Sequence, residues 1–96
     1  MYVVRDIFTA KPGMASKLAR IMKEVGTMQR GPKTRVLTDL VAGYNTVIME
    51  TEFKDLAGFE KNMEEYATMP ADVRAKMAGY TEMWTTGKRE ILRVLE

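Results

Sequence analysis

The side chains most able to do chemistry in this 96-residue chain are charged groups within otherwise apolar segments. Buried charge is costly unless it is paired, and carboxylates with perturbed pKa values cluster at functional sites. A carboxylate enclosed in a cavity could therefore act as a general base. The candidate bases are Asp6, Asp39 and Glu50, and the candidate ligand-binding cations are Arg5 and Arg93. The alternative role for all five is a structural ion pair or a charge at the rim of a dimer interface.

Three further residues are candidates for contact with a ligand. Trp84 is the only tryptophan; its indole could bind an aromatic substrate, or it could fill the fourth position of a helix stripe. Tyr44 and Asn45 stand between two predicted strands, where they could close the mouth of a pocket. Their alternative role is turn formation, because asparagine tolerates left-handed dihedral angles. The chain has nine methionines, whose adaptable thioethers could line a pocket or fill the core.

The composition removes many classes of reaction. Histidine and cysteine are absent, so this chain offers no disulfide, zinc finger, thiol nucleophile or histidine-based triad. We therefore expect no metal and no cofactor. Fifteen Lys and Arg against 13 Asp and Glu give a net charge of +2, which is too balanced to indicate nucleic acid or a membrane surface. No secretory signal or apolar run of ~20 residues is present, so we expect a soluble, cytoplasmic protein.

The elements that must position these residues follow from changes in hydrophobic periodicity along the chain. β-Branched and aromatic residues predict a first strand over Tyr2–Ala10. One apolar helical face then runs from Met14 to Met28, and Gly31-Pro32 is expected to end that helix.

Two central strands are expected over Thr34–Val41 and Thr46–Phe53, joined by a hairpin turn over residues 42–45. A two-residue loop at Gly43-Tyr44 would fix the register of these strands. It would pair Leu40 with Val47, Thr38 with Met49, and Arg35 with Glu52.

The last third of the chain indicates two helices and a strand. Asp55 is a plausible N-cap, because its carboxylate can accept a free backbone N–H. Pro70 fits the first turn of another short helix. The apolar face of that helix would comprise Val73, Met77, Tyr80 and Trp84. Gly87 is expected to end it, and Arg89–Leu95 is the predicted last strand.

The resulting order, β-α-β-β-α-(α)-β, is the ferredoxin-like α+β arrangement in a single domain over residues 1–96. It places helices on one face of a four-stranded antiparallel sheet. Apolar residues occupy both faces of the strands, so the uncovered face would expose a patch of roughly several hundred Å², more than monomers usually tolerate. We therefore expect a homodimer in which a second copy packs on this face. The alternative is a monomer with a partly apolar sheet.

The opening Tyr-Val-Val-Arg-Asp-Ile-Phe-Thr-Ala-Lys-Pro-Gly over residues 2–13, followed by an amphipathic helix, resembles the dimeric α+β barrel superfamily. Residues 37–50 resemble the central hairpin of NIPSNAP-like and antibiotic-biosynthesis-monooxygenase-like domains, and residues 87–94 resemble the final strand of NIPSNAP-like proteins. The resemblance implies that two sheets pair into one barrel. Members of this superfamily include cofactor-independent oxygenases, haem-degrading enzymes that rely on a histidine, and domains without known activity.

Two functions follow, and a third is disfavoured. The first is a small-molecule-binding or interaction module, which the absence of histidine and cysteine favours over an enzyme. The second is a cofactor-independent monooxygenase-type enzyme acting on a small aromatic or activated substrate in the barrel cavity. RNA-recognition domains share the order of elements, but Glu50 and Glu52 on the third strand would repel phosphates. We therefore expect no nucleic-acid partner.

Overall fold

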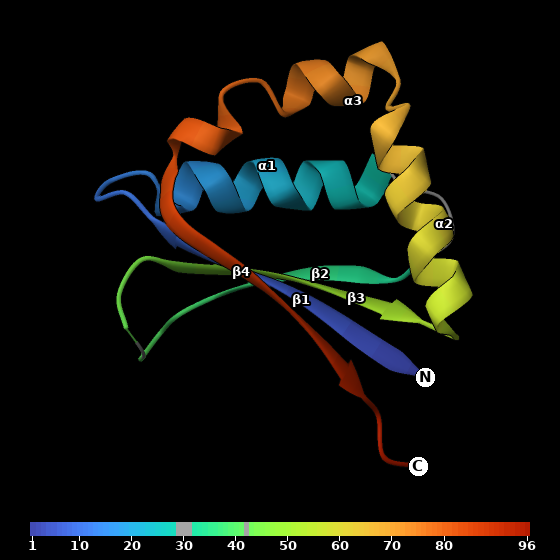
Figure 1. Ribbon diagram of the computed structural model, residues 1–96. Coiled ribbons are helices and arrows are strands. Elements are labelled where there is room, and N and C mark those ends of the chain that lie inside the picture. The colour runs from blue at the N-terminus through green and yellow to red at the C-terminus, as the bar shows by residue number, and fades with distance from the viewer. Residues whose placement is uncertain (29–31, 42) are drawn as a thin grey trace.

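Helices and strands segregate into two layers in the computed structural model, which describes residues 1–28, 32–41 and 43–96. The elements are β1 (Tyr2–Ala10), α1 (Ala15–Met28), β2 (Thr34–Thr38), β3 (Thr46–Phe53), α2 (Leu56–Ala67), α3 (Ala71–Lys76) and β4 (Trp84–Arg93), with a 3-10 helix over Tyr80–Glu82. The helices gather on one side of the sheet (Figure 1). Within the described ranges, no helix is long and apolar enough to cross a membrane.

The four strands form one antiparallel sheet in the order β2-β3-β1-β4. β1 is a central strand, paired with β3 on one side and with β4 on the other. The β1–β4 register shifts between Thr9 and Ala10, an irregularity of the kind that locally increases twist. This topology confirms the predicted ferredoxin-like α+β fold.

The core lies between the sheet and α1. Leu18, Met22 and Val25 recur at helical spacing on α1, and all three are buried. On β3 every second residue is buried, from Val47 to Phe53. Because side chains alternate across a strand, this pattern leaves the other half of β3 on the face away from the helices.

Several predicted boundaries are confirmed. β1 and β3 have the predicted bounds, and Asp55 caps α2, with its Oδ1 accepting a hydrogen bond from the Gly58 N–H at 2.8 Å. Pro70 is the N-cap of α3 and so lies one residue before the predicted first turn. The expected helix end at Gly31-Pro32 rests on residue 31, outside the described residues.

The predicted register of the β2–β3 pair is wrong by two residues. Val47 pairs with Thr38 and Glu50 with Arg35, and β2 ends at Thr38 instead of Val41. The reason is local chemistry after β2. Asp39 Oδ1 accepts a hydrogen bond from the Thr46 N–H at 3.2 Å, and this contact closes a connection longer than a two-residue turn.

The predicted helical placement of Trp84 is also wrong. α3 ends at Lys76, and Gly79 then adopts a left-handed conformation with φ of 79°, a conformation that ends helices. Trp84 is instead the first residue of β4, and Gly87 lies inside this strand. β4 therefore begins before the predicted start at Arg89 and ends at Arg93, short of Leu95.

Candidate functional site

A cavity of about 490 Å³ lies on the helix side of the sheet. β1 and β4 form its floor, and residues of α1, α2 and the segment around the 3-10 helix enclose it. Its volume is within the range of roughly 300–1,000 Å³ typical of small-molecule sites. The lining includes five methionines: Met22, Met49, Met63, Met69 and Met77. Thioethers repack easily, so this lining can adapt to the shape of a ligand.

Phe8 on β1 and Trp84 on β4 form one side of this cavity, which we call the aromatic wall. Their ring centroids are 5.2 Å apart, and the ring planes are inclined by 52°. The indole Nε1 of Trp84 is buried and has no hydrogen-bond partner within the described part of the chain. A buried donor without a partner costs roughly 1–3 kcal/mol, so the wall would gain stability from an acceptor that reached this group.

An ion pair stands at the edge of this apolar space. Asp6 and Arg89 face each other in the β1–β4 register, and Arg89 Nε donates to Asp6 Oδ1 at 2.6 Å. Arg89 Nη1 also donates to Met63 Sδ at 3.2 Å, and its Cζ lies 5.6 Å from the ring centroid of Phe59. These contacts hold the guanidinium in one place beside the Asp6 carboxylate.

Tyr66 brings a phenol from α2 to the same cavity. The pKa of Tyr66 is raised to about 12, chiefly by burial and also by the negative charge of Asp6, while the positive charge of Arg89 acts in the opposite direction. The phenol therefore stays protonated near neutral pH. It can serve as a neutral hydrogen-bond donor, but it is a poor base.

Of the residues predicted from the sequence, Asp6 and Trp84 both line the cavity. Glu50 and Arg5 lie on the opposite face of the sheet. There the Glu50 carboxylate lies 3.3 Å from Arg5 Nε and 2.6 Å from Arg35 Nη2. Its side chain is 13% exposed and lies between two cations, an arrangement that favours a structural ion pair over a general base.

The other predicted residues lie away from the cavity. Asp39 is occupied by its bond to the Thr46 N–H. Tyr44 and Asn45 form a left-handed turn with φ of 66° and 55°; Tyr44 is 83% exposed, and the Asn45 carbonyl accepts from the Ala10 N–H. Arg93 lies near the end of β4, with its Cζ 5.8 Å from the ring centroid of Tyr2.

Sequence reasoning missed Arg89, Tyr66 and Tyr80 as cavity residues. The sequence predicts Tyr80 only as a member of an apolar helix face. Arg89 could have been found by pairing the first and last strands in antiparallel register, because that pairing places it opposite Asp6.

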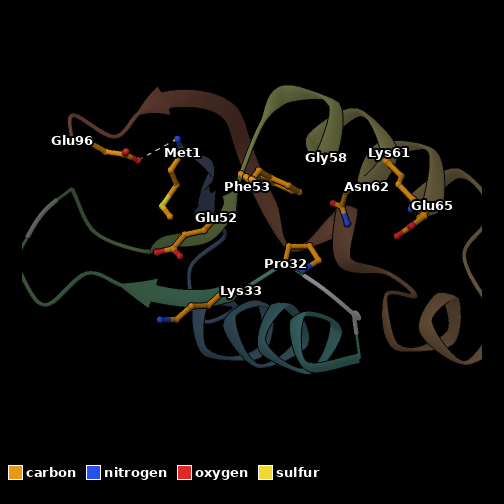
Figure 2. Close-up of a pocket in the computed structure, with 11 residues that line it drawn as sticks. Met1, Pro32, Lys33, Glu52, Phe53, Gly58, Lys61, Asn62, Glu65 and Glu96 are labelled. Atoms are coloured by element: carbon orange, nitrogen blue, oxygen red, sulfur yellow. Dashed lines mark ion pairs between the residues drawn. The ribbon is translucent and has the colours of Figure 1, made fainter.

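Two other hollows lie nearby. One of about 760 Å³ is shown in Figure 2, where a dashed line marks the 3.5 Å ion pair between the Met1 amino group and Glu96. Charged side chains of both signs dominate its lining, including Lys33, Glu52 and Lys61, and such groups are costly to desolvate. The other hollow, of about 550 Å³, shares the lining residues Tyr66 and Met69 with the aromatic-walled cavity.

The sequence matches no family model and no curated protein. Among solved structures, an uncharacterised NIPSNAP domain protein from Burkholderia xenovorans is similar at a TM-score of 0.81 and 15% identity, over 99% of this chain and 95% of that chain. A NIPSNAP family protein from Agrobacterium tumefaciens has a TM-score of 0.80 and 11% identity, over 99% and 93% of the chains.

A candidate antibiotic biosynthesis monooxygenase from Nitrosomonas europaea is similar at a TM-score of 0.75 and 12% identity, over 100% of both chains. Identities this low establish the fold alone. The chain thus shares its fold with NIPSNAP and antibiotic-biosynthesis-monooxygenase-like proteins, as the resemblance in its sequence predicts.

Proposed function

We propose that this protein binds a small, largely apolar molecule in the aromatic-walled cavity. The proposal is carried by one observation: an ion pair, Asp6–Arg89, borders a methionine- and aromatic-lined space of about 490 Å³. Ligand sites typically combine an apolar lining with a few fixed polar groups. A ligand with an apolar body and one hydrogen-bonding group matches this arrangement.

The polar groups also specify how that ligand is oriented. Its apolar body would contact the aromatic wall and the methionines. Its polar group would lie towards Asp6 and Tyr66, because a carboxylate accepts hydrogen bonds and a protonated phenol can both accept and donate them. A hydroxyl group can do both, so a neutral hydroxylated aromatic compound is a suitable probe.

The second part of the proposal is a homodimer formed through the face of the sheet without helices. Strand alternation places Leu37, Ile48 and Ile7 on this face as a row of facing partners, and Lys88 on β4 ends the row. The adjacent row is Arg35, Glu50, Arg5 and Glu90, in which positive and negative side chains alternate. A row of alternating charges beside three neighbouring apolar residues suits a symmetric interface.

The alternative function is a cofactor-independent monooxygenase-type enzyme. The observation that favours it is the Asp6 carboxylate beside the cavity, since such an enzyme needs a base to deprotonate its substrate. A structural neighbour also carries a monooxygenase name. The absence of histidine leaves Asp6 as the candidate base, and its pairing with Arg89 favours its role as a binding group.

The test is a calorimetric titration of the protein with 1-naphthol. We expect saturable binding, and we expect Met69→Glu to abolish it, because this substitution puts a charge into the cavity lining. Met14→Glu is the matched control: Met14 is 39% exposed and lies before α1, so binding should persist. Absence of saturable binding by the wild-type protein, or equal binding by both variants, would contradict the proposal.

The same samples distinguish a binding module from an enzyme. An oxygen electrode would record dioxygen uptake with 1-naphthol present. For a binding module we expect the background rate. Uptake that the wild-type protein accelerates and Asp6→Asn does not would favour the monooxygenase alternative.

A further inference from the structure

We infer that Gly87 is a positioning residue that sets the shape of the aromatic wall, and through it the choice of ligand. This inference rests on the proposed function of the cavity. Gly87 lies on β4 directly opposite Phe8 on β1 and lines the cavity. Trp84 precedes it on the same strand, so both rings of the wall border this glycine.

The space above Gly87 is filled by these two rings. A Cβ atom built there would lie 3.1 Å from Phe8 Cδ1, 3.2 Å from Phe8 Cε1 and 3.3 Å from Trp84 Cζ3. Carbon atoms in favourable contact are about 3.5–4.0 Å apart. A single methyl group would therefore force Phe8, Trp84 or both to move.

The backbone does not explain the glycine. Among the glycines in the described ranges, positive φ angles occur at Gly13 and Gly79, whereas Gly87 lies within a regular pairing of β4 with β1. Glycine inside a strand is less stable than alanine by roughly 0.5–1 kcal/mol. The absence of a side chain at Gly87 leaves space for the rings of Phe8 and Trp84.

The consequence concerns the cavity, because both rings that a methyl group would displace are part of its lining. Displacing the wall changes the volume and outline available to a ligand. Changes of one methylene in an apolar pocket alter selectivity roughly 10–200-fold. Gly87 therefore acts on ligand choice through Phe8 and Trp84, without needing to touch the ligand itself.

The experiment compares Gly87→Ala with Gly43→Ala. A Cβ at Gly43 would meet nothing within 4 Å, and Gly43 has no positive φ, so this variant controls for the loss of a glycine. The first measurement is the emission spectrum of Trp84, the only tryptophan, and its quenching by acrylamide in ligand-free protein. The second is the dissociation constant for 1-naphthol.

We expect Gly87→Ala to shift the Trp84 emission maximum, to change its quenching, and to weaken 1-naphthol binding roughly tenfold. Gly43→Ala should behave as wild type in both measurements. In a Phe8→Leu background, where the two shortest contacts involve a smaller side chain, Gly87→Ala should have a smaller effect on emission. If Gly87→Ala alone does not fold, we expect Phe8→Leu to restore folding in the double variant, and a double variant that stays unfolded would overturn the inference.

Wild-type emission and wild-type affinity in folded Gly87→Ala would overturn the inference. So would an equal emission shift with Phe8 and with Leu at position 8. If wild-type protein does not bind 1-naphthol, the proposed function fails with this ligand class. The ligand-free spectra still decide whether Gly87 positions the wall, so the two failures are distinguishable.

Discussion

Asp6 and Arg89 are 83 residues apart in the sequence, and their side chains meet across the β1–β4 ladder with Nε 2.6 Å from Oδ1. The pair joins the first strand to the last at the edge of the cavity. It is partly exposed, with 23% of the Asp6 side chain and 44% of the Arg89 side chain accessible. Water therefore weakens its electrostatic contribution to stability, while its position still matters for a ligand.

Replacing Asp6 with asparagine should separate these two roles. We expect Asp6→Asn to lower the free energy of unfolding by no more than ~1 kcal/mol, because solvent screens a partly exposed pair. We expect a larger relative effect on 1-naphthol affinity, because the strongest acceptor at the cavity edge is lost. Urea denaturation and calorimetric titration measure the two effects.

The matched control for this substitution is Asp72→Asn, on the exposed surface of α3. It should leave 1-naphthol affinity unchanged. Equal affinities for wild type and Asp6→Asn would show that the ion pair does not contact the ligand.

Tyr66 predicts a loss of stability at alkaline pH. Its pKa is raised in the folded protein from 10.0 to about 12. Below pH 10 the phenol is protonated in both the folded and the unfolded chain, and the favourable contribution is fully present. Between pH 10 and about 12 the unfolded chain releases the proton and the folded chain retains it, so stability falls as pH rises through this window.

Urea denaturation at about pH 9 and about pH 11 would detect this loss as a decrease in unfolding free energy. Tyr66→Phe should remove its share of the decrease, whereas Tyr44→Phe, which deletes an exposed phenol, should not. Asp6→Asn should lower the pKa of Tyr66, because it removes a nearby negative charge and leaves Arg89 in place. An alkaline absorbance titration of the tyrosines in wild type and in Asp6→Asn measures this pKa, and Tyr66→Phe identifies the signal of Tyr66. An unchanged Tyr66 pKa in Asp6→Asn would show that Asp6 does not act on this phenol.

How far the sequence predicts this structure depends on the range of the interactions involved. The β-branched residues of β1 and β3 were sufficient to predict the bounds of both strands. The carboxylate of Asp55 was sufficient to predict where α2 begins. The stripe containing Val73, Met77, Tyr80 and Trp84 has helical spacing, yet Gly79 interrupts it with a left-handed conformation. Gly79 signals the end of a helix, but the apolar spacing on both sides of it led to the prediction of one continuous helix.

The candidate site required long-range information. Arg5 and Asp6 are neighbours in a strand, so they must lie on opposite faces; Asp6 lines the cavity, and Arg5 pairs with Glu50 on the other side. Which face carries the helices depends on how the whole sheet is covered. Tyr66 and Arg89 join the site only once α2 and β4 are packed, and no local pattern encodes that packing.

Glu50 is predicted to stabilise the fold. We expect Glu50→Gln to lower the free energy of unfolding by on the order of 1–2 kcal/mol. The substitution leaves Arg5 and Arg35 adjacent to each other without their shared carboxylate. Both arginines are accessible to water, which keeps the expected loss below that of a fully buried pair.

Urea denaturation measures this loss, with Glu52→Gln as the control on the same strand. Calorimetry with 1-naphthol should show wild-type affinity for Glu50→Gln, because Glu50 lies on the other side of the sheet from the cavity. If Glu50→Gln lost 1-naphthol binding without losing stability, Glu50 would have a role in ligand binding.

The proposed dimer predicts that a charge at the centre of the uncovered face separates the protomers. Ile48 faces Ile7 on one side and Leu37 on the other, so Ile48→Glu would bury a carboxylate in the interface between two apolar facing partners. We expect sedimentation equilibrium to give the dimer mass for wild type and the monomer mass for Ile48→Glu. Ala57→Glu, at an exposed position of α2, should remain dimeric; a monomeric wild-type protein would refute the proposal.

The strand order β2-β3-β1-β4 also has a consequence for folding. Every described β1 residue that pairs with β3 pairs with β4 as well, so until β4 docks, one side of β1 carries a row of free amide and carbonyl groups. Such an unprotected edge is a template for intermolecular strand addition. A chain interrupted after Gly79 would therefore lack Trp84, Gly87 and Arg89 of the proposed binding site and would also be prone to self-association. Docking of β4 thus completes the cavity and protects the centre of the sheet from aggregation.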